Sequence, residues 1–196
     1  RVQGKARKVE QFDSMVIAQR SGRPVRLGEV VNVRDGFEEV RSLALVDGIL
    51  RAGLERGVKP LVEIGFMPQA LSLQPEPYRH SWPKELFTGW TTPPRDYERW
   101  GELVYRWAQH CVEVYGAAEV ESWWWQTWNE PNLGYWSGTP EEFFKLNDHA
   151  LAGVRRALPG ARVGGPHTAG DGGEFMEKFL EHALHGTNHA TGERGT

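Results

Sequence analysis

From about residue 48 onward, the chain alternates apolar segments of strand length with amphipathic segments of helix length. Short apolar runs bounded by proline or glycine are typical of parallel strands that are buried on both faces. We expect strands at 59–68, 122–128 and 161–166, and helices at 49–56, 93–115, 140–158 and 174–184. Because parallel strands need long crossover connections, this alternation predicts an α/β fold with a parallel sheet.

The ends of these helices carry recognisable capping residues. Thr92 followed by Pro93 predicts the start of one helix, and Gly116 predicts its end. Thr139 and Glu142 have the spacing of a capping box for the next helix. These signals support the division of the chain into alternating strands and helices.

The first 48 residues follow a different pattern. Alternating apolar and polar residues at 14–19, 25–33 and 42–46 are separated by turns that contain glycine or aspartate. We therefore expect two parts: a β-rich segment at 1–48 and an α/β domain at 49–196.

Composition excludes several classes of partner. The 196 residues carry a net charge of −3, which gives no electrostatic basis for binding nucleic acid. No apolar run approaches the roughly 20 residues of a membrane-spanning helix, and Cys111 is the only cysteine, so no internal disulfide can form. The start has neither an initiator Met nor a signal-peptide pattern, which is typical of a processed or excised chain and leaves bacterial cytoplasm and periplasm both open.

Aromatic residues are concentrated in WWWQTWNEPNLGYW, residues 123–136. Asn129 and Glu130 stand where the expected strand gives way to its loop, because Pro131 cannot continue a strand ladder. Aromatic neighbours such as Trp128 and Trp136 withdraw water from a carboxylate and favour its protonated form, which suits a general acid. Flat aromatic faces and an amide also suit sugar rings, so the pattern indicates glycoside hydrolysis.

Four ordered motifs make the chain from about 46 to 196 resemble glycoside hydrolase family 39, which contains β-xylosidases and α-L-iduronidases. The motifs are KPLVEIGFMP, TPPRDYERWGELV, TWNEPNLGYW and RVGGP. The resemblance implies strands three to five of a (β/α)8 TIM barrel and a retaining mechanism. It also implies that Glu130 is the acid/base and that Asn129 contacts the sugar 2-hydroxyl, while Trp136 matches an aromatic wall residue.

The tryptophans also have a structural interpretation. Trp123, Trp124 and Trp125 are expected to pack between the sheet and its helices. Trp128 and Trp136 are candidates for contact with a xyloside or a uronic-acid glycoside, and packing in the core is an equal alternative for both.

The second carboxylate of a retaining site is expected outside this chain. Such a site needs two carboxyl groups about 5 to 5.5 Å apart, and the family resemblance puts the nucleophile, a Glu, at the end of the seventh strand. Glu63 lies within the expected third strand and is not a candidate for that role. We therefore expect little hydrolysis by this chain alone, and a sugar-binding fragment without turnover is an alternative.

Residues 1–48 resemble a periplasmic docking segment of a resistance-nodulation-division efflux transporter, on the run RPVRLGEVVNVRDGFEEVRSLALVDG. This resemblance predicts a mosaic in which a transporter fragment precedes the middle of a glycosidase barrel. A transporter-derived interaction segment is thus a further alternative function, and the oligomeric state is open.

No cofactor or metal is expected from the sequence. His182, His185 and His189 have spacings that a metal site could use, but no carboxylate joins them in an established pattern. Histidines at the polar end of a helix are the simpler interpretation. The glycine-rich run at 170–175 lacks the spacing of a phosphate-binding loop.

Overall fold

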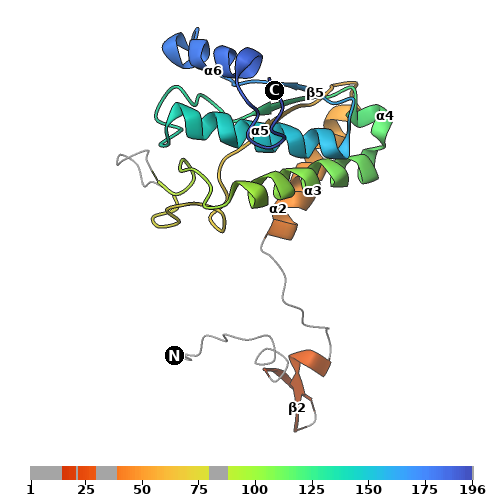
Figure 1. The fold of residues 1–196 in the computed structure, drawn as a ribbon. Helices are drawn as coiled ribbons and strands as arrows, with labels where there is room; N and C mark the ends of the chain where they lie inside the picture. The colour runs from red at the N-terminus through yellow and green to blue at the C-terminus, as the bar shows by residue number, and fades with distance from the viewer. Residues whose placement is uncertain (1–14, 21, 30–38, 80–87, 196) are drawn as a thin grey trace. The chain divides into compact units, whose positions relative to one another are not determined.

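The computed structural model describes residues 15–20, 22–29, 39–79 and 88–195 (Figure 1). The chain divides into two compact units, Arg1–Arg56 and Gly57–Thr196. Among the described residues, no helix combines the length and the apolar character needed to cross a membrane.

The first unit contains an antiparallel hairpin of β1 (Val16–Arg20) and β2 (Arg23–Arg26). Gly22 lies in its turn with φ of +75°, a conformation that glycine adopts without steric cost. The hairpin confirms the strand predicted at 14–19 and the start of the one predicted at 25–33. After Arg26 the chain forms the short 3-10 helix η1 (Leu27–Glu29), and residues 30–33 lie outside the described part of the chain.

The strand predicted at 42–46 is wrong, because these residues lie within helix α2 (Glu39–Leu54). The Ser-Leu-Ala-Leu-Val run alternates for only five residues, whereas its Leu and Ala residues are strong helix formers within a longer helical segment. Residue 48, the predicted boundary between the two parts of the chain, also lies inside α2. The helix ends close to the predicted stop at Gly57, whose φ is +74°.

The second unit is built on a parallel sheet of β3 (Leu61–Ile64), β4 (Trp124–Thr127) and β5 (Arg162–Gly164) in the order β3-β4-β5. Trp125 of β4 is opposite Val62 of β3 and Val163 of β5. The parallel sheet predicted from the alternating pattern is thus confirmed, and the carboxyl ends of the three strands meet at one edge.

The connections between the strands are helical, as Figure 1 shows. They are α3 (Tyr97–Tyr115), α4 (Ala117–Val120), α5 (Pro140–Ala157) and, after β5, α6 (Gly173–His185). The capping box of α5 is confirmed: the Glu142 N–H donates to the Thr139 hydroxyl, and the Thr139 N–H donates to the Glu142 carboxylate. Gly116 ends α3, as predicted.

Helix α3 does not begin at Thr92. Its cap is Asp96, whose carboxylate accepts from the Arg99 N–H at 3.0 Å. The Thr92 hydroxyl instead donates to the Gly89 carbonyl and lies 2.7 Å from the Ser72 hydroxyl. The segment before α3 is held extended by pairing with residues 71–73, where the Leu73 N–H donates to the Pro93 carbonyl, so the helix cannot start there.

One face of the sheet forms the core of the unit. Val62, Ile64 and Trp125 are buried on it, and Trp107 of α3 contacts Trp125 edge-on at 5.9 Å between ring centroids. On α5, a Cβ atom at Gly153 would lie 2.6 Å from the Gly101 carbonyl oxygen of α3, so the glycine permits close approach of the two helices.

The opposite face of the sheet is exposed. Leu61 and Trp124, which are register partners on β3 and β4, are 60% and 52% exposed. The Arg162 guanidinium of β5 lies 5.6 Å from the centroid of the Trp124 ring, and this cation–π contact continues the same row of side chains. The exposed face therefore combines apolar and charged groups.

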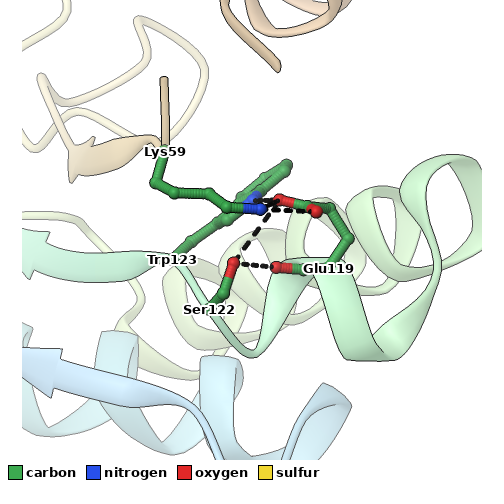
Figure 2. A network of polar contacts seen from close by, with 4 residues as sticks. All are labelled: Lys59, Glu119, Ser122 and Trp123. Carbon is green, nitrogen blue, oxygen red and sulfur yellow. Dashed lines mark hydrogen bonds and ion pairs between the residues drawn. The ribbon is translucent and has the colours of Figure 1, made fainter. Parts of the chain in front are cut away.

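A polar network ties the beginnings of β3 and β4 to α4 (Figure 2). The Lys59 ammonium lies 2.6 and 2.7 Å from the two carboxylate oxygens of Glu119, and the Trp123 indole N–H donates to the same carboxylate at 2.9 Å. Hydrogen bonds from Lys59 and then from Trp123 hold the pKa of Glu119 below its ordinary value. The network fixes the amino end of the sheet.

Candidate active site

Trp128, Asn129 and Glu130 directly follow β4, at the carboxyl edge of the sheet. The Trp128 N–H donates to the Ile64 carbonyl of β3 at 3.0 Å. On the other side, Asn129 forms an isolated parallel bridge with His167, and the Glu130 N–H donates to the His167 carbonyl at 2.7 Å. Backbone bonds to both neighbouring segments therefore fix Glu130 at the predicted place.

The backbone on both sides of Asn129 has an uncommon conformation. Trp128 has φ of +68° and Glu130 has φ of +46°, in the left-handed region that residues with a Cβ atom rarely occupy. Each such residue costs about 1–2 kcal/mol. Strain of this kind is concentrated at functional sites, where surrounding contacts maintain it.

Trp128 and Trp136 are both buried. Their rings meet edge-on with centroids 5.3 Å apart. The Trp128 indole N–H donates to the Tyr135 carbonyl at 2.8 Å, and the Trp136 indole N–H donates to the Thr139 carbonyl at 2.9 Å. Both indoles thus hold backbone carbonyls of the segment after β4, and the predicted contact with a sugar stays a prediction.

The other three tryptophans of the run divide between the two faces of the sheet. Trp123 and Trp125 are buried, which confirms their predicted place in the core. Trp124 was predicted to pack in the same way, but it is exposed, because alternate residues of a strand point to opposite faces.

Three half-buried aromatic residues near the loop after β4 were not among the predicted site residues. The Phe66 ring, just after β3, lies 4.9 Å from Trp90, 5.3 Å from Trp128 and 5.9 Å from Tyr135 between centroids. Tyr135 is part of the quoted tryptophan-rich run, which is the signal that could have identified it, whereas Phe66 lies inside the strand predicted at 59–68 and carried no such signal. Phe66, Trp90 and Tyr135 are each partly exposed.

A polar triad joins the three strands on the exposed face of the sheet. Gln126 of β4 donates its side-chain N–H to the Glu63 carboxylate of β3 at 3.0 Å. The His167 Nδ1, after β5, lies 3.1 Å from the same Glu63 oxygen and 3.0 Å from the Gln126 nitrogen. The Glu63 carboxylate therefore already has two polar partners, Gln126 and His167. No motif in the sequence distinguishes His167.

The loop after β4 is also tied to the loop after β5. The Asn132 side-chain amide donates to the Ala169 carbonyl at 3.0 Å, and its oxygen accepts from the Ala169 N–H at 2.9 Å. This two-bond link and the Glu130–His167 bond hold the two loops together beside the candidate acid.

The fold and the position of these polar groups define a class. A parallel sheet in sequential order, with helical crossovers and polar side chains at the carboxyl ends of its strands, is the arrangement of (β/α)8-barrel enzymes.

Comparison with known proteins identifies the family within that class: the chain belongs to the glycosyl hydrolases family 39, whose sequence model matches residues 26–190. A β-xylosidase of Caldicellulosiruptor saccharolyticus is 41% identical over 128 residues, covering 64% of this chain and 25% of the relative. Human α-L-iduronidase is 36% identical over 103 residues, covering 49% of this chain and 16% of the relative.

Solved structures give the same result. The crystal structure of a monomeric β-xylosidase from Caulobacter crescentus CB15 matches with a TM-score of 0.61 and 29% identity. The match covers 79% of this chain and 29% of that one. This chain therefore spans about a quarter of the length of the β-xylosidases it matches.

The comparisons give no support to the efflux-transporter resemblance predicted for residues 1–48. The family 39 match begins at residue 26 and includes residues 26–48 of that segment.

Proposed function

We propose that this chain is the acid/base-bearing part of a retaining glycosidase of the β-xylosidase type, with Glu130 as the acid/base. The observation that carries the proposal is the position of Glu130 at the carboxyl end of β4 in a chain of family 39. Its backbone has a left-handed conformation, and its N–H donates to the His167 carbonyl.

In the proposed reaction, Glu130 donates a proton to the glycosidic oxygen as the leaving group departs. It then removes a proton from the water that hydrolyses the glycosyl-enzyme intermediate. Asn129, held between the strained residues, is proposed to donate its amide to the sugar 2-hydroxyl. The nucleophile is proposed to be a Glu from the seventh strand of the complete barrel, as the family resemblance implies.

The substrate is proposed to be a β-xyloside, because the identity to a β-xylosidase is higher than that to human α-L-iduronidase. Phe66 and Tyr135, which are partly exposed, are proposed as the ring surfaces that face the sugar. Trp128 and Trp136 are proposed to position the loop after β4. Both are buried and use their indole N–H groups to hold backbone carbonyls.

A graft tests the role of Glu130. Residues 57–195 replace the aligned segment of the Caldicellulosiruptor saccharolyticus β-xylosidase, and hydrolysis of aryl β-xylosides is measured. Glu130→Gln should lower kcat/KM, which reports the step that expels the leaving group, by about 10²–10⁴-fold for a poor leaving group, since such a leaving group needs the proton. The loss should be smaller for a dinitrophenyl leaving group.

Glu177→Gln, on the exposed surface of α6, is the matched control and should leave both rates unchanged. Equal loss of kcat/KM for good and poor leaving groups would show that Glu130 is not the acid. The 196-residue chain alone should hydrolyse the same substrates at a rate near background, and turnover that Glu130→Gln abolishes would contradict the need for a later strand.

Sugar binding without turnover is the second candidate, and the partly exposed rings of Phe66, Trp90 and Tyr135 favour it for the chain alone. Xylose should then quench tryptophan fluorescence of the 196-residue chain, and Tyr135→Ala should reduce the quenching. Quenching that is the same with mannitol would contradict specific binding.

A further inference from the structure

Three potential metal ligands come together where α6 ends beside α5. Asp148 lies in the middle of α5, His182 lies in the last turn of α6, and His189 lies in the segment after it. One ligand atom of each side chain is within 4.8 Å of those of the other two. Asp148 is fully buried, His182 is half-buried and His189 is exposed, so the group reaches from the interior to solvent.

Asp148 contacts both histidine residues of this group. The His182 Nε2 atom lies 2.9 Å from the Asp148 Oδ2 atom, and the His189 backbone N–H donates to the same oxygen at 2.8 Å. The two imidazole rings are nearly parallel, at 17°, with centroids 5.4 Å apart. Two imidazoles bound to one tetrahedral zinc ion at about 2.0–2.1 Å would have centroids about 5 Å apart.

The His182 ring is held in place from two further sides. The Phe144 ring of α5 stacks on it at 5.1 Å and 16°. At Gly186, a Cβ atom would lie 2.6 Å from the His182 Nδ1 atom, so this side of the ring is closed and Nε2 is the nitrogen that faces Asp148. Supporting contacts of this kind orient the ligands of metal sites.

We propose that Asp148, His182 and His189 bind one divalent transition ion of the zinc type, with water as the fourth ligand. Two imidazoles and one carboxylate suit Zn²⁺ and leave one position open. The ion would neutralise a carboxylate that is fully buried. Binding requires the Nε2–Oδ2 distance to open from 2.9 Å to the roughly 3.3–3.5 Å edge of a zinc tetrahedron.

The site would clamp α6 and the segment after it to α5. The sequence showed the three histidines but did not connect them with Asp148, which lies 34 residues before His182. His185, the third histidine, is exposed and is not part of the group. The rival interpretation is a hydrogen-bonded Asp148–His182 pair that needs no ion.

Zinc titration of the 196-residue chain tests the proposal after treatment with EDTA and dialysis. We expect calorimetry and native mass spectrometry to find one Zn²⁺ per chain, and Zn²⁺ to raise the Tm. Mg²⁺ should not do so, because it prefers oxygen ligands in octahedral geometry. Co²⁺ should give the visible absorption of a tetrahedral site.

His189→Gln removes an exposed ligand and should weaken Zn²⁺ binding at least about tenfold, with loss of the Co²⁺ spectrum. His185→Gln is the matched control on the same surface and should bind as the unchanged chain does. Circular dichroism checks that both variants are folded. Equal weakening by the two substitutions, or Zn²⁺ binding by the unchanged chain no tighter than by His189→Gln, would overturn the proposal.

Discussion

At the candidate site, the position of Asn129 and Glu130 follows from a local sequence signal, whereas the backbone conformation of Glu130 does not. A strand followed by Pro131 is a local pattern, so the sequence could predict that Asn129 and Glu130 lie at a strand end. In its left-handed conformation, Glu130 donates its N–H to the carbonyl of His167, which follows another strand, β5. No local pattern could have predicted it.

Replacing Glu130 by glycine tests this strain. Because Glu130 has φ of +46°, Glu130→Gly removes a steric cost of about 1–2 kcal/mol, which offsets the higher entropy of glycine in the unfolded chain. We expect a free energy of unfolding that is unchanged or higher. In the interior of α6, Glu177→Gly should lower it by about 1 kcal/mol. Denaturant unfolding of both variants makes the comparison, and equal losses would argue against strain at Glu130.

The Glu119 network in Figure 2 should make stability depend on pH in the acid range. The pKa of Glu119 is lowered in the folded chain from about 4.5, so its contribution is present above pH 4.5 and is lost as pH falls through the folded pKa. The stability difference between the unchanged chain and Glu119→Gln should therefore shrink below pH 4.5. Glu113→Gln, at an exposed position of α3, should show no such trend in thermal unfolding.

At the scale of elements, periodicity and caps predicted β3, β4, β5 and α5 correctly, because their signals are local. The start of α3 was predicted wrongly, since pairing of the preceding segment with residues 71–73 overrides the Thr-Pro signal at Thr92. In the same way, the exposure of Trp124 and the contact between Asp148 and His182 depend on which faces of the elements meet in the folded chain.

The capping box of α5 offers a test at this scale. Thr139→Ala removes the hydroxyl that accepts from the Glu142 N–H and should lower the free energy of unfolding by about 1 kcal/mol. Thr139→Ser keeps the acceptor and should lose much less. If the two substitutions cost the same in urea unfolding, the methyl group rather than the cap would be responsible.

At the scale of the whole molecule, the sheet of the second unit has one covered face and one exposed face. Exposed apolar groups on a sheet face favour association with other surfaces. The prediction of a partial barrel agrees with this arrangement and with the family 39 structures. The prediction of a transporter segment lacks support, and the family 39 match includes residues 26–48 of that segment.

The exposed side chains Leu61 and Trp124 should mediate association between copies of this chain. We expect the double variant Leu61→Thr/Trp124→Thr to have an apparent mass closer to the 22.2 kDa of one chain than the unchanged protein has, in light scattering after size-exclusion chromatography. Leu133→Thr, at another exposed position, is the control and should have little effect. An unchanged mass distribution in the double variant would show that this face does not mediate association.

The sequential order β3-β4-β5 has a consequence for synthesis on the ribosome. Strand β4 pairs with β3, and β5 pairs with β4, so each of these two strands meets, as it emerges, a neighbour that has already left the exit tunnel. In this unit the nascent polypeptide can extend its sheet in the direction of translation, without waiting for residues that have yet to be added.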